Sequence, residues 1–489
     1  MAGAMAASGQ AVRSGVVGLG QLAHSQEAGF RRKLGGGRVD ASRHQSLGPS
    51  VCQLCAAVRS SRRSSAESEL QLVRRCCAPV CSASTSLSSS CGSSFRAEER
   101  IVGHETKGGS CNKKSRSQRQ PGIVLPRASG GGNGEVGVAT VADNADVSSS
   151  SMTTTVGGDG GLQICRILNG MWQTSGGWGR IEPSKAVAAM FEHVDNGLTT
   201  FDMADHYGPA EDLFGLFHNQ ALRERGEEYA SKVQGLTKWC PSPVKMTRSV
   251  VEQNIDRSRK RMDVKRLDML QFHWWDYANP GYLDALKHMQ DLKEEGKIAQ
   301  LSLTNFDTKR LQIILENGIS IASNQVQYSL VDQRPDKEMA KLCQMTGVKL
   351  ITYGTVLGGL LSEKYLGKGQ PGSWGGPTLN TPSLNKYKRM VDVWGGWELF
   401  QQLLRECNTI AKKHGVSMAT VGLRFVLDQS AVGGSMVGVR LGIAQHIEDS
   451  KKVFGLKLDE DDRQRLETVT GQSRDLLVII GDCGDEYRG

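Results

Sequence analysis

Apolar and polar positions follow a regular order only from about residue 162 onward. Short runs of apolar and β-branched residues, typical of buried strands, alternate there with longer segments in which apolar residues recur every three or four positions, typical of helices that face a core. Eight strand segments are predicted in this way, at residues 164–172, 198–205, 233–239, 267–275, 298–305, 321–329, 348–355 and 433–440.

The segments between these strands carry helix signals. The segment 183–197 has a proline at its start and a glycine at its end, and Asp307 is a suitable N-cap for the helix expected after it. One stretch interrupts the alternation: residues 367–396 are rich in Gly, Trp and Pro and include Trp374 and Trp394. We expect an irregular excursion there, which either folds over a ligand or has no fixed structure.

Eight strands alternating with helices predict an α/β protein of the (β/α)8 TIM-barrel class, over residues 161–489. A doubly wound sheet is the alternative, and it would need a glycine-rich turn between a strand and a helix. The near match GLGQLA, at residues 18–23, is followed by FRRKLGGG and lacks that context. The pattern therefore favours the barrel.

The first 160 residues have a different composition. Tracts such as SASTSLSSSCGSS and GGGNG cannot bury enough apolar surface to offset chain entropy, so this segment is predicted to be disordered. Its Arg- and Ser-rich, acid-poor start is typical of an organelle transit peptide, which we expect at residues 1–97, followed by a linker at 98–160. The heavy use of Ser favours a chloroplast over a mitochondrion.

Charge follows the same division. Residues 1–150 hold 19 Lys and Arg against 10 Asp and Glu, so the whole formal charge of +9 lies there and the remainder is neutral with 41 of each. A neutral body gives no compositional reason to expect a nucleic-acid partner. No apolar run approaches the roughly 20 residues of a membrane-spanning helix, so no membrane association is expected.

Seven of the twelve cysteines lie in the N-terminal segment. Cys52-x-x-Cys55 could begin a zinc site, but no second pair with suitable spacing follows, and solvated thiols of a transit peptide explain the pair better. The five cysteines of the body are scattered, as expected for reduced thiols. No metal site is predicted.

Polar side chains recur where three predicted strands end. Asp202 ends the second strand and Tyr207 lies just beyond it, Lys238 ends the third, and His273 ends the fourth. The carboxyl ends of all barrel strands share one face, so these side chains can converge. Each alone has a plain structural explanation, as a turn, surface or core residue. Lys232 is the other candidate for the lysine of this group. It falls at the start of the third strand, however, and therefore at the opposite face of the barrel.

The stretch FDMADHYG resembles the aldo-keto reductase signature, in which Asp ends a strand and a D-x-A-x-x-Y-G turn follows. With Lys in LTKW and His in LQFHWW, the chain is similar to members of that family of the plant chloroplast NADP-linked type. The resemblance implies a catalytic tetrad of Asp202, Tyr207, Lys238 and His273. Lys238 would lower the pKa of Tyr207, Asp202 would keep Lys238 charged, and neutral His273 would hydrogen-bond the substrate carbonyl while Tyr207 acts as general acid.

The resemblance also implies a cofactor, NADPH. SLTNF, NQVQYS and ITYGT match segments that hold the nicotinamide, and MVGVRLGIAQHIEDS matches the adenosine-phosphate segment, where Arg440 would meet the 2′-phosphate. The chain departs from the residues usual in the family at Thr304, at Gly354-Thr355-Val356 and at Asp449. The implied cofactor residues are Asn305, Gln325, Tyr353, Thr355, Leu357, Gly359, Arg440, Gln445, Glu448 and Asp449.

The chain is thus expected to be an NADPH-dependent enzyme that transfers hydride to the aldehyde or ketone group of a small molecule. A nicotinamide-binding, redox-sensing regulatory subunit with little turnover is the alternative. A lyase that forms a Schiff base on Lys238 is a third possibility, which Asp202 and Tyr207 disfavour by keeping that lysine charged. The sequence predicts neither the substrate nor the oligomeric state.

Overall fold

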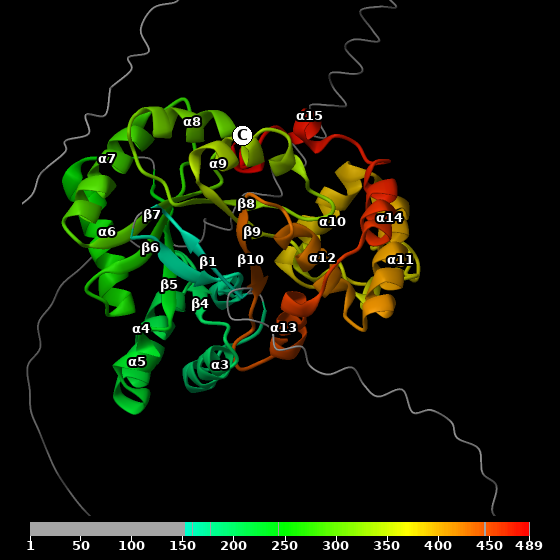
Figure 1. Cartoon of the computed structure of the whole chain (residues 1–489), viewed down its shortest axis with the longest axis horizontal. Coiled ribbons are helices and arrows are strands. Elements are labelled where there is room, and N and C mark those ends of the chain that lie inside the picture. The colour runs from blue at the N-terminus through cyan, green and yellow to red at the C-terminus, as the bar shows by residue number, and fades with distance from the viewer. Residues whose placement is uncertain (1–151, 159, 177, 243, 445, 489) are drawn as a thin grey trace, which may run out of the picture. The chain divides into compact units, whose positions relative to one another are not determined.

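A computed structural model of the chain describes residues 152–488, apart from residues 159, 177, 243 and 445. The predicted transit peptide and nearly all of the predicted linker lie outside the described residues. The described part forms a closed barrel of eight parallel strands surrounded by helices (Figure 1). The expected (β/α)8 architecture is confirmed.

All eight predicted strands are present, and each is shorter than its predicted segment. In the order in which they neighbour one another they are β3 (Ile167–Gly170), β4 (Thr200–Asp202), β5 (Gln234–Trp239), β6 (Leu267–Phe272), β7 (Ile298–Thr304), β8 (Ser323–Gln327), β9 (Lys349–Tyr353) and β10 (Val432–Gly438), which closes on β3. Their residues are almost all buried, because helices cover the outside and packed side chains fill the inside.

Helices follow the strands around the outside of the barrel (Figure 1). They are α3 (Pro183–Asp195), α4 (Ala210–Arg225), α5 (Glu227–Ala230), α6 (Arg248–Met262), α7 (Gly281–Glu294), α8 (Thr308–Glu316), α9 (Met339–Thr346), α10 (Pro382–Trp394), α11 (Gly396–His414), α12 (Met418–Leu427), α13 (Ile447–Gly455), α14 (Glu460–Thr470) and α15 (Leu476–Ile480). The expected N-cap of α8 is observed, since Asp307 accepts a hydrogen bond from the Arg310 amide at 2.6 Å. None of the helices in the described part of the chain is both long enough and apolar enough to cross a membrane.

A hairpin precedes the barrel and was not predicted. Strand β1 (Thr153–Val156) pairs antiparallel with β2 (Leu162–Cys165), and Arg166 separates β2 from β3, so the first predicted strand is in fact two. The hairpin places Val156 and Ile164 in a separate core cluster with barrel residues such as Leu236. Gln300, near the start of β7, donates to the carbonyl oxygen of Gly160 in the turn of the hairpin at 3.1 Å, so the hairpin closes the amino-terminal end of the barrel. Ordered structure therefore begins before residue 161.

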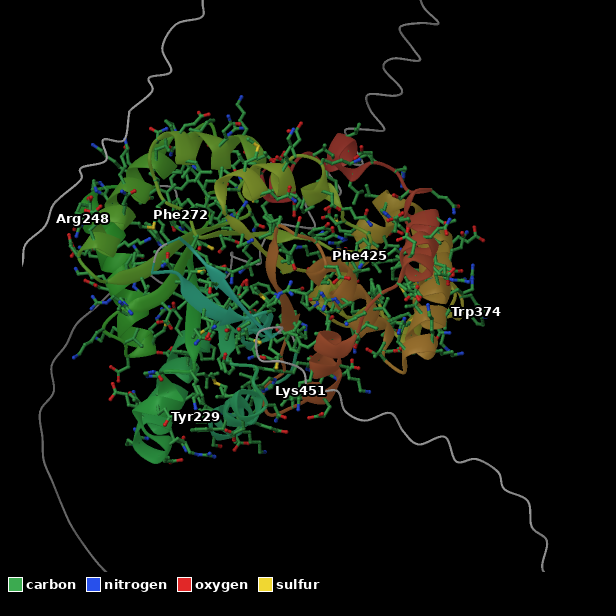
Figure 2. All side chains as sticks on the ribbon, in the orientation of Figure 1. Tyr229, Arg248, Phe272, Trp374, Phe425 and Lys451 are labelled. Carbon is green, nitrogen blue, oxygen red and sulfur yellow. The ribbon has the colours of Figure 1, made fainter. Side chains whose placement is uncertain are left out.

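The predicted irregular excursion at residues 367–396 contains helix α10. Thr381 caps it by accepting a hydrogen bond from the Leu384 amide at 3.2 Å, and Pro382 occupies its first turn. Trp394 is buried against the core, whereas Trp374 is fully exposed at the outer edge of the molecule (Figure 2). The excursion is therefore partly helical, and one of its tryptophans packs inward.

Candidate functional site

A buried ion pair joins the carboxyl ends of β4 and β5. The ammonium group of Lys238 donates to Asp202 Oδ2 and, at 2.9 Å, to the carbonyl oxygen of Met203. Lys238 is 3% exposed and Asp202 is fully buried. Lys232, the competing lysine, is exposed and pairs with Glu228 before β5 begins. The structure therefore brings together the two charges that the sequence placed at these strand ends.

Two amide side chains hold the second oxygen of Asp202. Gln271 Nε2 donates to Asp202 Oδ1 at 2.7 Å and Gln325 Nε2 donates to the same atom at 2.9 Å, while Gln325 also donates to Gln271 Oε1 at 2.5 Å. Gln325 was predicted from the resemblance, but Gln271 was not. Gln271 lies two residues before His273, and side chains two positions apart on a strand share a face. That spacing could have predicted Gln271 as a residue of the site.

Tyr207 packs over this pair. The Lys238 ammonium lies 4.9 Å from the centroid of the Tyr207 ring, and the ring of Trp172 meets it edge-on at 4.9 Å. Burial and then the negative charge of Asp202 raise the pKa of Tyr207 well above its ordinary value, opposite to the expected lowering. The ammonium of Lys238 does not reverse this rise, because it is already paired with Asp202. The phenol therefore keeps its proton at neutral pH.

His273 follows β6 and is buried beside the ring of Trp275, at 4.2 Å between centroids. Its Nδ1 lies 3.2 Å from the carbonyl oxygen of Thr304, which can only accept, so this contact places the ring proton on Nδ1. Nε2 is buried without a hydrogen-bond partner within the described structure. In this tautomer Nε2 is an acceptor, so donation to a substrate carbonyl would require moving the proton to Nε2.

Burial, followed by the positive charge of Arg488, lowers the pKa of His273 to about 3 from its ordinary 6.5. Below pH 6.5 the unfolded chain binds a proton at His273, whereas the folded chain does not until the pH falls to about 3. Protonation therefore favours the unfolded state, and the fold is fully stable above pH 6.5 and loses stability as the pH falls below it. We expect the free energy of unfolding to drop by up to about 1.4 kcal/mol per pH unit between these values. Urea unfolding at pH 7, 6 and 5 measures this slope.

His273→Gln should remove that part of the pH dependence. His288→Gln is the matched control, because His288 lies on the surface of α7 beside Asp291. It should retain the slope of the unmodified chain. Equal slopes for His273→Gln and the unmodified chain would contradict a neutral, buried imidazole.

The end of the chain packs onto the same face of the barrel. The hydroxyl of Tyr487 lies 3.0 Å from that of Tyr353, which in turn donates to Asn305 Oδ1 at 2.8 Å. Arg488 donates to the carbonyl oxygen of Trp274 at 2.7 Å. Gly484 has a φ of 86°, and a Cβ there would lie 2.1 Å from the carbonyl oxygen of Asn305, so only glycine fits. Residues 481–488 (hereafter the C-terminal tail) thus line the site, which the sequence did not indicate.

A buried arginine anchors the C-terminal tail. Arg334, which follows β8, donates to Asp332 Oδ2 at 2.8 Å and to Glu486 Oε2 at 3.0 Å, and also to the carbonyl oxygens of Gly481 and Asp482. Burial alone would lower the pKa of Arg334, but the two carboxylates raise it well above its ordinary value. All three charged side chains are at most 2% exposed, so the network is shielded from solvent.

The remaining predicted cofactor residues lie after β9 and β10. Thr355 is buried and its hydroxyl contacts Ser435 at 2.8 Å, while the amides of Leu357 and Gly359 donate within tight turns. Arg440 is exposed and donates to the carbonyl oxygen of Trp178 at 2.7 Å. On α13, Asp449 accepts from Ser417 at 2.7 Å and Glu448 pairs with Lys451 at 3.3 Å. Gln445 lies outside the described residues.

Similarity to known proteins extends over most of the barrel. A family model described as "Aldo/keto reductase family" matches residues 166–470. The chain is 26% identical to flagellar radial spoke protein 5 of Chlamydomonas reinhardtii, over 49% of this chain and only 56% of that protein. It is 25% identical to "Pyridoxal reductase, chloroplastic" of Arabidopsis thaliana, over 58% of this chain and 76% of that protein.

The chain is also similar to a bacterial reductase and to one solved structure. L-glyceraldehyde 3-phosphate reductase of Escherichia coli (strain K12) is 27% identical, with 58% of this chain and 82% of that protein covered. Among solved structures, the glycerol dehydrogenase AKR11B4 of Gluconobacter oxydans superposes with a TM-score of 0.53 at 21% identity, covering 68% of this chain and 97% of that one. The superposition supports the fold alone.

Proposed function

The chain belongs to the aldo/keto reductase family, and on that premise we propose that it is an NADPH-dependent reductase of small aldehydes or ketones. Family membership makes it an oxidoreductase that acts on carbonyl groups. One observation carries the finer proposal: the ion pair of Lys238 and Asp202 is buried beneath the ring of Tyr207 at the carboxyl face of the barrel. That is the face on which enzymes of this fold place their chemistry.

The chain's own residues would manage the proton. NADPH, when bound, would supply the hydride. Tyr207 remains protonated at neutral pH and so can deliver its proton to the substrate oxygen as negative charge develops there. Lys238 lies below the ring and would stabilise the phenolate that remains. Asp202, fixed by three hydrogen bonds, keeps Lys238 in position.

The residues at the carboxyl face suit a nicotinamide. Tyr353 offers an aromatic ring at the end of β9, and the amide of Asn305 lies beside it. The buried Nε2 of His273 has no partner in the described structure and leaves one polar atom for a ligand. Gln325 already gives its amide nitrogen to Asp202, so only its carbonyl oxygen could meet a carboxamide.

Arg440 would select NADPH over NADH. Its exposed guanidinium follows β10 and could pair with the 2′-phosphate. We expect Arg440→Met to raise the KM for NADPH by about tenfold or more, because a charge-assisted hydrogen bond is worth at least ~1.5 kcal/mol. The KM for NADH should change little. Steady-state kinetics with both cofactors measure the ratio, and equal effects on both would contradict the assignment.

A panel of carbonyl compounds tests the function itself. The full chain with NADPH should oxidise the cofactor when given at least one aldehyde or ketone, and pyridoxal and glyceraldehyde 3-phosphate belong in the panel because relatives are named for them. If NADPH binds but no carbonyl is reduced, the chain is the regulatory subunit instead. Trapping of a substrate on Lys238 by borohydride would indicate the lyase.

For localisation we propose the chloroplast. The proposal is supported by the Ser- and Arg-rich composition of residues 1–97 and by a relative whose name places it in that organelle. A fluorescent protein fused after residue 97 should accumulate in plastids of a plant cell. Fluorescence confined to mitochondria or cytosol would contradict the proposal.

A further inference from the structure

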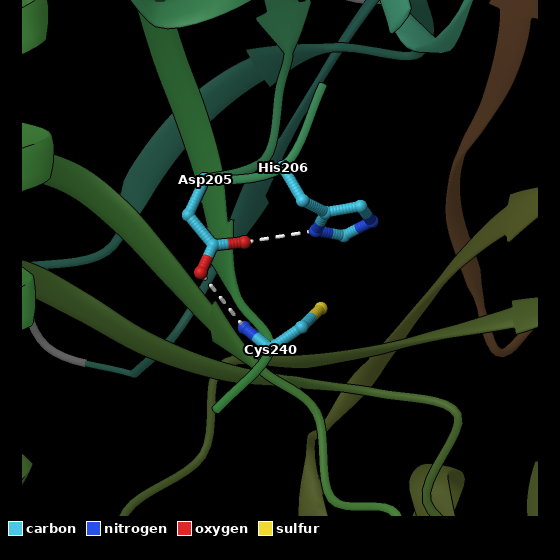
Figure 3. A group of neighbouring side chains, drawn as sticks. All are labelled: Asp205, His206 and Cys240. Atoms are coloured by element: carbon cyan, nitrogen blue, oxygen red, sulfur yellow. Dashed lines mark hydrogen bonds and ion pairs between the residues drawn. The ribbon is translucent and has the colours of Figure 1, made fainter. Parts of the chain in front are cut away.

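A second group of reactive side chains lies beside the proposed proton donor. Asp205 and His206 directly precede Tyr207, and Cys240 follows the end of β5 (Figure 3). The carboxylate, imidazole and thiol each offer one ligand atom, and these atoms lie within 4.8 Å of one another. None of the three takes part in the chemistry proposed above. We propose that Asp205, His206 and Cys240 form a binding site for a Zn²⁺ ion.

The backbone holds these residues in register. The amide of Asp205 donates to the carbonyl oxygen of Lys238 at 2.9 Å, which continues the pairing of β4 with β5 beyond the strands. The amide of Cys240 donates to Asp205 Oδ2 at 3.3 Å, and Arg261 donates to the carbonyl oxygen of Asp205 at 2.9 Å. Two separate segments are therefore fixed before any ion arrives.

The orientation of the side chains agrees with shared coordination. His206 Nδ1 faces the carboxylate of Asp205 at 2.8 Å, and the thiol of Cys240 points toward the imidazole ring (Figure 3). The rings of Trp172 and Tyr207 pack edge-on against His206, at 6.2 and 4.9 Å between centroids, and restrict its rotation. The three donors thus face a common space.

The donor types select the metal. One thiolate, one imidazole and one carboxylate suit Zn²⁺, whereas Mg²⁺ and Ca²⁺ prefer oxygen alone. Tetrahedral zinc places its ligand atoms roughly 3.3–3.8 Å apart, so side-chain shifts of about an ångström would complete the site. Three protein ligands leave the fourth position to water. The thiolate and carboxylate together balance the two positive charges of the ion.

Binding requires definite proton movements. The thiol of Cys240 gives up its proton to solvent, because only the thiolate binds zinc. The hydrogen bond between His206 and Asp205 opens, and the ring proton moves from Nδ1 to Nε2 so that Nδ1 can bind the ion. One proton is therefore released for each ion bound, and binding should strengthen as the pH rises.

Cobalt titration tests the site directly. The full chain is used with its seven N-terminal cysteines changed to Ser, so that they supply no thiolate. Co²⁺ should produce a thiolate charge-transfer band that saturates at one ion per chain. Added Zn²⁺ should displace the Co²⁺ and remove the band. Cys240→Ser should abolish the band, and His206→Gln and Asp205→Asn should each weaken Zn²⁺ binding by at least about tenfold. His288→Gln, which alters a His–Asp pair without a cysteine, should not.

A second measurement needs no variant at the site. Cys240 is half-buried, while the other four described cysteines are buried, so alkylation of the folded chain should occur first at Cys240. Zn²⁺ should protect it, as read by mass spectrometry, and should raise Tm. The absence of a stoichiometric band, its survival in Cys240→Ser, or unchanged alkylation with Zn²⁺ would each overturn the proposal. None of these readouts depends on carbonyl reduction.

Discussion

Replacing Tyr207 with Phe is expected to lower the rate of carbonyl reduction by about 10²–10⁴-fold. The change removes only the hydroxyl group, so the ring should keep its packing against Trp172 and its position over Lys238. The substrate oxygen would then have to take its proton from water. NADPH binding, measured by fluorescence titration, should stay within about twofold because the phenol is not a proposed cofactor ligand.

Tyr229→Phe is the matched control. Tyr229 lies at the outer edge of the molecule (Figure 2), where its hydroxyl donates to Asp195 at 2.8 Å. Its loss should leave turnover unchanged, so the comparison separates a missing proton donor from a missing phenol in general. Turnover of Tyr207→Phe equal to that of the unmodified chain would refute the role of Tyr207 as general acid.

Replacing Arg334 with Met is expected to reduce the free energy of unfolding by about 3–5 kcal/mol. The change leaves Asp332 and Glu486 buried without their shared cation and breaks the contacts that anchor the C-terminal tail. Denaturant unfolding at pH 7 measures the loss. Glu486 has a pKa that burial would raise but Arg334 lowers, so without Arg334 it should protonate more easily, and the deficit should shrink as the pH falls.

Arg465→Met supplies the comparison. Arg465 also pairs with two carboxylates, Asp461 and Glu406, but it is 44% exposed, and exposed ion pairs contribute little to stability because water screens them. Adding Asp332→Asn and Glu486→Gln to Arg334→Met should restore part of the stability by removing the uncompensated charges. A loss below ~1 kcal/mol for Arg334→Met would show that the network does not anchor the tail.

The barrel could be predicted because its signals are local. Most strands are short apolar or β-branched runs, and Asp202, Lys238 and His273 lie at or next to the carboxyl ends of three of them. Several of the helices between carry their own start and stop residues. The position of Lys238 rather than Lys232 followed from counting along one strand, and the structure indeed places Lys238 against Asp202 and Lys232 at the other end. The alternation of strands and helices predicts a parallel barrel. In such a barrel the carboxyl ends of neighbouring strands lie together, and this brings Lys238 to Asp202.

The parts that the sequence did not predict depend on distant contacts. Gln271 and Asp202 are 69 residues apart, and nothing near Gln271 names its partner. The C-terminal tail forms only a single 3-10 turn, at Asp485–Tyr487, and is held by Arg334 and by contact with Asn305, so it carries no periodic pattern. Helix α10 is the exception: its cap Thr381 and its Pro382 were visible but were outweighed by the surrounding Gly, Trp and Pro.

The hairpin of β1 and β2 also limits where the chain can be cut. It places Val156 and Ile164 in contact with barrel residues, so these residues belong to the folded body. If residues 1–97 are a transit peptide, as predicted, their removal must leave the chain from Thr153 onward intact. Removal of a further dozen residues would expose apolar side chains at the amino-terminal end of the barrel, and such a product would be prone to aggregate. The fold itself therefore limits how far into the chain such a cut could fall.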